Sequence, residues 1–454
     1  MKIPLPPPPM SELMRELSSE DFADVLESSA PLVKGRYLHW DELRHREPPQ
    51  NLSHDKWWLA IRLARAGFLQ SLPFFDKTGV PFRFGMPEPV LIHLHHIDRN
   101  AAGQIIASSE IATSEHQARY LIDSLMNEAI TSSQLEGAAT TRKAAEAMLR
   151  DGRPPVSHSE KMIFNNYIAM QRIREIRNEP IAPELIFELH RILTEDTLED
   201  PNDAGRLRTN DEIRVIDKRD GVIIHQPPSF KELPKRLDLL CQFANSDENA
   251  NPFVHPVIRA ILLHFMVGFD HPFVDGNGRT ARALFYWSLA RSGYWLMEYI
   301  SISELLKAAP SKYVRAYLHA ETDGGDTTYF ILHQLAVIRR AIEKLHEYID
   351  RVRSEQSMTE QLLARSKQLR SALNHRQIAL ITHALKHPGE QYLVETHQRT
   401  HGVSYETART DLLELSNLNI LEKDKIGKAF VFTAPDDLRK RIESLSKGRA
   451  SAPK

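Results

Sequence analysis

Residues 271–282 read HPFVDGNGRTAR and are the most informative stretch of this chain. Gly276, Asn277 and Gly278 form a turn that opens onto a segment with helical periodicity, Arg279 to Ser292, so the turn is predicted to lie at a helix N-terminus. Free backbone amides and the positive end of the helix dipole favour anions at such a position. The stretch therefore predicts a phosphate-binding turn within a helical region.

Charged side chains around this turn supply the other parts of a phosphate-transfer site. Arg279 and Arg282 are three residues apart, so both guanidinium groups can bind successive phosphates from one side of the helix. Asp275 offers a hard carboxylate oxygen to Mg²⁺. His271 can accept a proton from an attacking hydroxyl near neutral pH. Each part alone is common, but their combination within so short a stretch indicates nucleotide chemistry.

The stretch resembles the full motif of the Fic (filamentation induced by cAMP) family of protein adenylyltransferases, with every defining position of HPFxDGNGRxxR filled. The resemblance covers about residues 110–350 and extends to His255-Pro256, Glu188-Leu189-His190 and Gly205-Arg206. It implies that His271 deprotonates a Ser, Thr or Tyr hydroxyl of a target protein or of the chain itself. That oxygen would attack the α-phosphorus of ATP, and pyrophosphate would leave.

The same resemblance implies a role for each remaining residue of the motif. Asp275 would hold Mg²⁺ between the α- and β-phosphates, and Arg279 and Arg282 would bind the outer phosphates. Gly276, Asn277 and Gly278 would form the anion cradle. Relatives that transfer a phosphoryl group carry a larger residue in place of a cradle glycine, so this sequence favours nucleotidyl transfer. Because the cradle reads phosphates and not the base, transfer of UMP or phosphocholine stays open. Tyr313 is the candidate wall of an adenine pocket.

A second motif precedes the first by more than a hundred residues. Ser132 and Glu136 are four residues apart on one face of an expected helix that ends at Gly137. Alone, this pattern is typical of a helix end with a capping glycine. Beside the Fic motif, it resembles the inhibitory motif of that family, which implies a bidentate pair between Glu136 and Arg282 that keeps ATP in a non-productive pose or excludes it. Removal of AMP from a modified target by the same glutamate stays open.

The overall pattern predicts a mainly α fold with a Fic-type helical core. We expect an N-terminal helical extension over 1–105, a Fic domain over 106–350 with the inhibitory helix near 120–137, a connecting helix over 351–373, a winged-helix domain over 374–440 and a disordered tail over 441–454. Two β-rich runs around Asp220-Gly221 predict a hairpin, which in an α domain is either a substrate-facing flap or a surface turn.

The expected C-terminal domain has the order helix, helix, helix and β-wing, with Lys423, Lys425 and Lys428 on the wing. These lysines favour phosphate contacts, whereas neighbouring Glu422 and Asp424 dilute the positive charge. DNA binding and protein docking therefore both stay open. The alternative from another functional class is a DNA-binding regulator whose Fic domain is a sensor with little turnover.

Composition narrows the remaining choices. A formal net charge of -2 excludes a basic field over the whole molecule, and Cys241, the single cysteine, excludes an intrachain disulfide. The N-terminus lacks the apolar run of a secretory signal, and Val257 to Phe269 is too short and too polar to cross a bilayer. We expect a cytoplasmic protein without membrane contact, and its oligomeric state, including a homodimer, stays open.

Two groups of histidines offer competing metal-site hypotheses. His93 and His96 have helical spacing, although no acidic or cysteine ligand has suitable spacing nearby. A hydrolase-like cluster would bring His255, His264 and Asp270 together with His271. No recognised ligand spacing favours that cluster.

Overall fold

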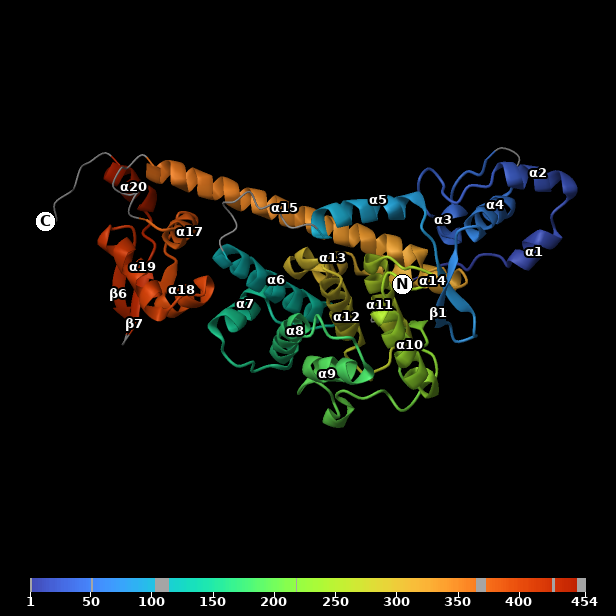
Figure 1. The fold of residues 1–454 in the computed structure, drawn as a ribbon, viewed down its shortest axis with the longest axis horizontal. Helices are drawn as coiled ribbons and strands as arrows, with labels where there is room; N and C mark the ends of the chain where they lie inside the picture. Colours follow the sequence, from blue (N-terminus) through green and yellow to red (C-terminus); the bar gives the residue numbers. More distant parts are fainter. Residues whose placement is uncertain are drawn as a thin grey trace. The chain divides into compact units, whose positions relative to one another are not determined.

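The computed structural model describes residues 2–49, 52–102, 114–217, 219–364, 373–426 and 429–446. The chain divides into two compact units, one formed by Met1–Ile105, Ser124–Leu149 and Arg153–Ile342 and the other by Ile106–Asp123, Arg150–Gly152 and Glu343–Lys454. We call them the larger and the smaller unit. Helices predominate in both, as expected for the mainly α class (Figure 1).

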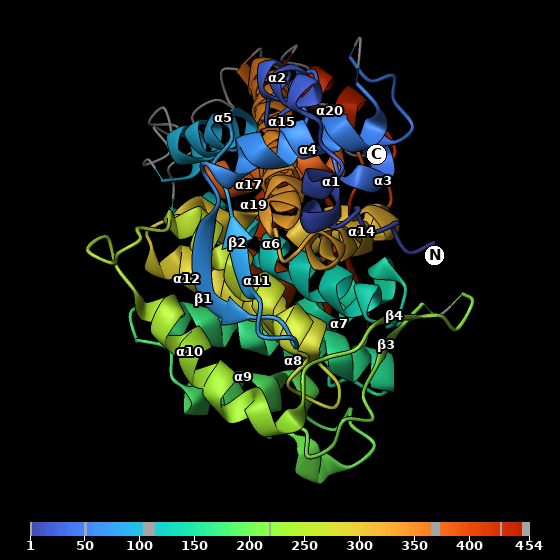
Figure 2. The ribbon, with the colours of Figure 1, turned by 90° about the vertical axis from the view of Figure 1, so that its right-hand side faces the viewer.

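The N-terminal part of the larger unit packs around its own cluster of buried side chains, including Trp57, Trp58 and Ile61. Its helices are α1 (Met10–Arg15), α2 (Ser19–Glu27), α3 (Trp40–Leu43), α4 (His54–Ala66) and α5 (Glu88–Ile97), and α5 continues into the π-helix η1 (Asp98–Ala102). Contrary to the expected helices and loops, it also contains an antiparallel hairpin of β1 (Gln70–Phe75) and β2 (Pro81–Phe84) (Figure 2). Leu72 and Phe74 alternate inward along β1, which is the period of a strand.

The helical core of the larger unit is organised around α11 and α12, which are buried over most of their length. Nearly every residue of the predominantly apolar α11 is buried, its polar residues Arg259, His264 and Asp270 included. The pair is α11 (Pro256–Asp270) and α12 (Asn277–Arg291), and the other helices of this core are α6 (Ser114–Leu135), which belongs to this unit from Ser124 on, α7 (Arg142–Asp151), which belongs to it up to Leu149, α8 (His158–Glu175), α9 (Pro183–Thr194), α10 (Leu233–Asn245), α13 (Ile302–Ala308) and α14 (Pro310–Thr322). Short 3-10 helices are η2 (Pro201–Asp203), η3 (Phe230–Glu232) and η4 (Trp295–Tyr299).

Local sequence sets the ends of the two central helices. Pro256 is at the first position of α11, where the missing amide hydrogen costs nothing, and the His255 side chain accepts a hydrogen bond from the Val257 amide. The helix ends because His271 adopts a left-handed conformation. Gly276, with a φ of 83°, starts α12. The loop between these ends contains the first part of the sequence motif, and α12 contains the rest.

The expected hairpin is present as β3 (Val215–Ile216) paired antiparallel with β4 (Ile223–His225). Gly221 has a φ of 71°, and the Asp220 side chain accepts a hydrogen bond from the Val222 amide in the turn. Residue 218 lies outside the described residues. We call residues 215–225 the flap, and Ile216 and Ile223 are exposed on it.

The smaller unit contains a three-stranded antiparallel sheet in the order β5-β7-β6. Its elements are β5 (Gln391–Leu393), α17 (His375–Ala384), α18 (Val394–His401), α19 (Tyr405–Asn417), β6 (Glu422–Ile426), β7 (Ala429–Thr433) and α20 (Leu438–Ser446). A strand thus precedes α18, which the expected order of three helices and a β-wing did not include. Ile381, Leu412 and Phe432 are buried in the core of this unit. The assignment as a winged helix stays a prediction.

The predicted boundaries near the C-terminus differ from the observed elements. One helix, α15 (Thr328–Ala364), runs without a break through residue 351, where a separate connecting helix was expected to begin. Residues 365–372 and the wing positions 427–428 lie outside the described residues. The tail was expected from residue 441, but α20 continues to Ser446, and residues 447–454 also lie outside the described part. Within the described residues, no helix has the length and apolar character needed to span a bilayer.

Candidate active site

His271, the candidate base, is oriented by the residue that follows it. Pro272 has no amide hydrogen, so the carbonyl of Gly268, four residues earlier, lacks its usual helical donor. The His271 ring replaces that donor, with Nδ1 3.2 Å from the Gly268 oxygen. A carbonyl only accepts, so Nδ1 carries the hydrogen of the neutral ring. Nε2 is therefore the nitrogen with the free lone pair.

The electrostatic surroundings keep this ring neutral. Burial lowers the pKa of His271, and the charges of His225 and Arg208 lower it further. The hydrogen bond from Nδ1 to Gly268 and the negative charge of Glu136 act in the opposite direction on the same pKa. A base must be unprotonated to accept a proton, and a lowered pKa keeps it so at neutral pH.

Arg208 fixes the backbone of His271 and of the residue that follows it. Its Nε donates to the His271 carbonyl at 3.0 Å, and its amide donates to the Pro272 carbonyl at 2.9 Å. The guanidinium also donates to the Pro228 carbonyl and pairs with Asp211 at 2.8 Å. Arg208 was not among the predicted residues, because its sequence position, far from the motif, gives no sign of this contact.

Asn277 shapes the anion turn rather than presenting its side chain to a ligand. Its Oδ1 accepts from the Phe273 amide at 2.9 Å, and its Nδ2 donates to the Phe273 carbonyl at 2.8 Å. The predicted phosphate role of Asn277 therefore falls to its backbone amide. No side chain caps the N-terminus of α12, which leaves the first-turn amides without a side-chain acceptor.

His190 supports the turn from α9, another contact that the motif did not reveal. Its Nδ1 accepts from the Gly205 amide at 2.9 Å, so its Nε2 donates to the Asp275 carbonyl at 2.8 Å. The ring stacks on Phe273 at 3.8 Å, and burial lowers the pKa of His190 to about 4. A Cβ on Gly276 would lie 2.7 Å from Thr194 Cγ2 and 3.3 Å from His190 Nε2, and the φ of Gly276 is 83°, so glycine suits this position.

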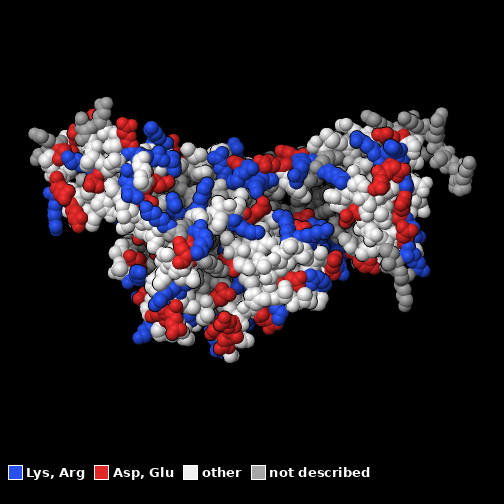
Figure 3. Space-filling view, turned by 180° about the vertical axis from the view of Figure 1, so that it is seen from behind, with Lys and Arg blue, Asp and Glu red and all other residues white. Residues whose placement is uncertain are grey.

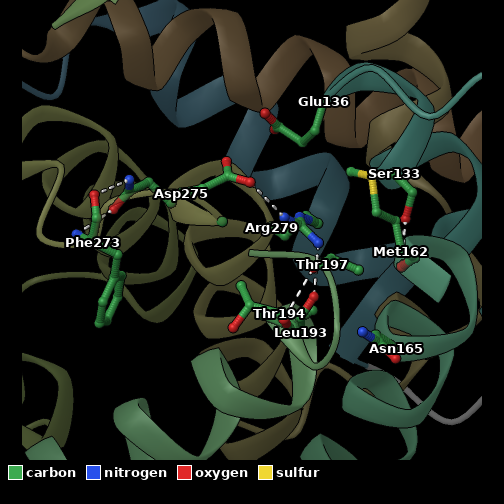
Figure 4. A network of polar contacts seen from close by, with 12 residues as sticks. Ser133, Glu136, Met162, Asn165, Leu193, Thr194, Thr197, Phe273, Asp275 and Arg279 are labelled. Atoms are coloured by element: carbon green, nitrogen blue, oxygen red, sulfur yellow. Dashed lines mark hydrogen bonds and ion pairs between the residues drawn. The ribbon is translucent and has the colours of Figure 1, made fainter. Parts of the chain in front are cut away.

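Arg279 and Asp275 occupy the mouth of the turn. Arg279 is almost fully buried, donates to the Leu193 carbonyl at 2.7 Å and lies 3.4 Å from Asp275 Oδ2 (Figure 4). Part of its guanidinium is thus bound to protein, although its Nε has no hydrogen-bond partner. The Asp275 side chain is 62% exposed, which suits a ligand that must reach an incoming metal.

Ser132 and Glu136, from the end of α6, both contact Arg282. Arg282 Nε donates to the Ser132 hydroxyl at 2.8 Å, and Nη2 donates to the Ser132 carbonyl at 3.1 Å and to Glu136 Oε1 at 2.8 Å. The predicted ion pair is present, but it is not bidentate, because Ser132 takes Nε. Arg282 Nη1 is buried without a hydrogen-bond partner.

The carboxylate of Glu136 also lies directly over the cradle glycine Gly278. A Cβ built on Gly278 would collide with Glu136 Oε1, and it would lie 2.8 Å from Glu136 Cδ and 3.1 Å from Arg282 Nη1. Glu136 therefore fills the space that the missing side chain leaves. An anion already occupies part of the predicted phosphate site, and that anion belongs to the protein.

Tyr313, the candidate for the adenine pocket, comes from α14. Its hydroxyl lies 2.8 Å from His264 Nε2 and also faces Arg282, and burial raises the pKa of Tyr313. This hydroxyl is directed towards the arginine end of the site.

The hypothetical hydrolase-like metal cluster does not form. His255 contacts Asp98 at 3.2 Å, His264 contacts Tyr313, and Asp270 pairs with Arg236 at 3.1 Å. Each side chain has its own partner on a different element. Across the described ranges, no three His, Cys, Asp or Glu side chains are grouped as metal ligands, His93 and His96 included.

Comparison with known proteins places this site in context. Residues 180–289 match the family model of the Fic/DOC family. Curated relatives include the Protein adenylyltransferase Fic of Drosophila ananassae and that of Drosophila melanogaster, each 33% identical over 159 residues, or 34% of this chain. The match spans 29% and 30% of the length of those two relatives.

Similar solved structures include a Fic family protein from Desulfovibrio desulfuricans G20, with a TM-score of 0.49 and 17% identity over 76% of this chain and 96% of that one. Another is a Fic domain-containing signaling protein from Bacteroides thetaiotaomicron VPI-5482, with a TM-score of 0.45 and 20% identity over 56% of this chain and 94% of that one.

Proposed function

We propose that this chain is a protein adenylyltransferase that rests in an inhibited state, because residues 180–289 match the family model of the Fic/DOC family. It transfers AMP from ATP to a Ser, Thr or Tyr hydroxyl of a target protein or of itself. The observation that carries the proposal is the position of Glu136, which lies against both Gly278 and Arg282 beside a correctly oriented base.

The chemistry follows from the orientation of His271. The target hydroxyl gives its proton to His271 Nε2 while its oxygen forms a bond to the α-phosphorus. The bond from that phosphorus to the bridging oxygen of the β-phosphate breaks, and pyrophosphate leaves with the electron pair. The first-turn amides of α12, with Arg279 and Arg282, stabilise the negative charge of the phosphates.

Asp275 is the residue that we propose to hold Mg²⁺. Mg²⁺ is commonly bound by one or two carboxylates together with substrate phosphates, and a single exposed carboxylate beside the anion turn fits that chemistry. When bound, the ion would offset the charge of the α- and β-phosphates. We propose that Tyr313 forms a wall of the adenine pocket, and its mutation to Phe and to Ala separates the effect of the hydroxyl from that of the ring.

Glu136 acts as the brake in this proposal. The γ-phosphate needs Arg282, whose guanidinium is already bound by Ser132 and Glu136. A second anion over Gly278 would meet the carboxylate at close range, and two negative charges in contact repel each other. ATP therefore binds productively only when Glu136 moves away.

Removal of the Glu136 carboxylate tests the brake. We expect Glu136→Gly to raise self-modification about tenfold or more, measured as transfer of label from ATP labelled at the α-phosphate. Adding His271→Ala to this variant should abolish the transfer. Glu146→Gly, on α7, is the matched control, since Glu146 pairs with Arg142 and not with the site. Unchanged labelling of Glu136→Gly would refute the brake.

The transferred group needs a separate measurement. Intact-mass analysis of Glu136→Gly after incubation with ATP, UTP, GTP or CDP-choline would identify it, and we expect the mass of AMP. Transfer of UMP or phosphocholine would reassign the substrate. Loss of AMP from a previously modified protein, faster with Glu136 than without it, would assign the reverse reaction to that glutamate.

For the smaller unit we propose a winged-helix domain over 374–440, without assigning it DNA. On β6, Lys423 and Lys425 alternate with Glu422 and Asp424, and Lys423 Nζ lies 4.1 Å from the centre of the Phe430 ring. Figure 3 shows positive and negative side chains interspersed over the face that it presents. A salt series of electrophoretic shifts separates DNA binding from protein docking.

A further inference from the structure

His225, at the end of flap strand β4, makes two polar contacts through opposite ring nitrogens. Nδ1 lies 2.8 Å from Glu321 Oε2 on α14, and Nε2 lies 2.7 Å from the Phe269 carbonyl in the last turn of α11. A carbonyl and an ionised carboxylate can only accept hydrogen bonds. Both contacts are made together when both ring nitrogens carry hydrogen, so the geometry fits an imidazolium.

The Phe269 carbonyl needs this donor because its helical partner is engaged elsewhere. In a continuing helix the Phe273 amide would donate to it, but that amide donates to Asn277 Oδ1 at 2.9 Å. A positive side chain at a helix C-terminus is favoured both by the orphan carbonyls and by the helix dipole. His225 therefore caps α11 two residues before the base.

We propose that His225 is a positioning residue for His271, linking the flap to the helical turn that carries the base and placing a positive charge beside it. The inference rests on the proposed function for its kinetic test only. His225 does not touch the reacting atoms and acts through His271. The flap, the base and α14 are thereby joined at one side chain.

Charges from every neighbouring element bear on the pair of histidines. Glu321 on α14 faces His225, and Asp270 at the end of α11 senses its charge. Arg236 and Glu232 also affect Asp270, whose pKa burial raises to about 6. At His271, after burial, the charge of His225 lowers the pKa, Glu136 raises it and Arg208 lowers it. Replacing His225 by a neutral residue should therefore raise the pKa of His271.

The substitution His225→Gln separates charge from hydrogen bonding, because an amide can still donate to the Phe269 carbonyl. His225→Leu removes both. Arg214→Gln is the matched control: Arg214 bonds to Gln226 at the flap at 3.1 Å and is exposed, so it removes a positive charge that does not face the base. Circular dichroism of each variant confirms that it is folded.

The direct measurement is a titration of the His271 ring by NMR, with its signal assigned by comparison with His271→Ala. We expect His225→Gln and His225→Leu to raise the pKa of His271 by about one unit, the size of effect that one neighbouring charge produces, and Arg214→Gln to leave it unchanged. This result does not depend on turnover. An unchanged His271 titration in folded His225→Gln would overturn the proposal.

The kinetic measurement uses the Glu136→Gly background. The acidic limb of the pH-rate profile should move up by about one pH unit in both His225 variants, and His225→Leu should also lower the plateau rate about tenfold or more because the base is misplaced. If the His225 variants labelled more slowly but the acidic limb of their pH-rate profile stayed in place, the role of His225 would be structural only. No labelling by Glu136→Gly itself would reject the proposed function, while the NMR titration would still decide on His225.

Discussion

At the scale of single residues, the most consequential feature is the missing amide hydrogen of Pro272. It frees the Gly268 carbonyl for His271 Nδ1, and this hydrogen bond at 3.2 Å selects the tautomer with an accepting Nε2. The proline that follows His271 thus determines which ring nitrogen of the proposed base carries the hydrogen. The sequence motif predicted the base, whereas only the backbone path explained why proline follows it.

This reasoning predicts a defect when Pro272 gains an amide. In Pro272→Ala the new N–H competes with His271 Nδ1 for the Gly268 carbonyl, so the ring should lose its fixed tautomer. In the Glu136→Gly background we expect transfer to slow about tenfold or more, with little change in the KM for ATP. Steady-state kinetics with labelled ATP measure both. Pro201→Ala, in η2, serves as a control for the loss of a proline remote from the motif. If Pro272→Ala transferred label as fast as its Glu136→Gly parent, the argument would be wrong.

At the scale of secondary-structure elements, the brake depends on how α6 is held. Glu128, one turn before Ser132, is buried and accepts from Tyr286 at 2.9 Å, from Ser301 at 2.7 Å and from the Ser303 hydroxyl at 2.5 Å. These donors belong to α12 and to the region where α13 begins. Glu128 therefore anchors α6, and through this helix it helps to hold Glu136, the residue directly after the last residue of α6.

Removal of this anchor should release the brake without touching the site. Glu128→Ala leaves buried hydroxyls without an acceptor, so we expect it to lower the free energy of unfolding by about 3 kcal/mol and to raise basal labelling. Denaturant titration and label transfer measure the two effects. Asn127→Ala, which removes only the contact with Glu304 at 2.9 Å, is the control. A destabilised Glu128→Ala protein with unchanged labelling would show that α6 keeps its position without the anchor.

The same scale shows what sequence reasoning could and could not reach. The helices around the motif and the hairpin at Gly221 were predictable because periodicity and turn residues are local. The β1–β2 hairpin was missed, since its inward residues Leu72 and Phe74 are flanked by few strand-forming neighbours. His190 and Arg208 were not assigned as supports because their contacts with the motif span 85 and 63 residues. Such contacts leave no trace in local spacing.

At the scale of the whole molecule, the N-terminal segment is part of the larger unit. Arg65 is buried, with its guanidinium 3.6 Å from the centre of the Tyr37 ring and Nη1 2.8 Å from the Tyr329 hydroxyl. Arg236 donates to the carbonyls of Phe75 and Asp76 and pairs with Asp270, the residue before the base. The extension is therefore linked through Arg236 to the carboxylate of the residue before His271.

Buried neutral histidines predict a loss of stability in acid. Burial lowers the pKa of His190, His319 and His333 to about 4, from about 6.5 in an unfolded chain. Between these values the unfolded chain binds more protons, so stability falls as the pH drops, by at most about 3 kcal/mol for each residue. Asp270 and Asp323, whose pKa burial raises to about 6, oppose this trend.

We therefore expect the thermal midpoint to decrease as the pH is lowered from about 7 to about 5. In His319→Gln the midpoint should decrease less over this range, relative to the midpoint of the same variant at neutral pH. Scanning calorimetry across this range measures both. A midpoint that rises on acidification would mean that the two aspartates outweigh the histidines.

The close contact between Glu136 and Gly278 has a consequence for how the protein can evolve. In the proposed function, the space left by the absent side chain of Gly278 serves both Glu136 as inhibitor and the phosphates of the substrate, which cannot occupy it together. Mutation at Gly278 cannot weaken one occupant without harming the other. We therefore expect the strength of inhibition to change through substitutions in α6 and at its anchor, while the glycine stays constant. Differences in regulation should accumulate on one side of this contact alone.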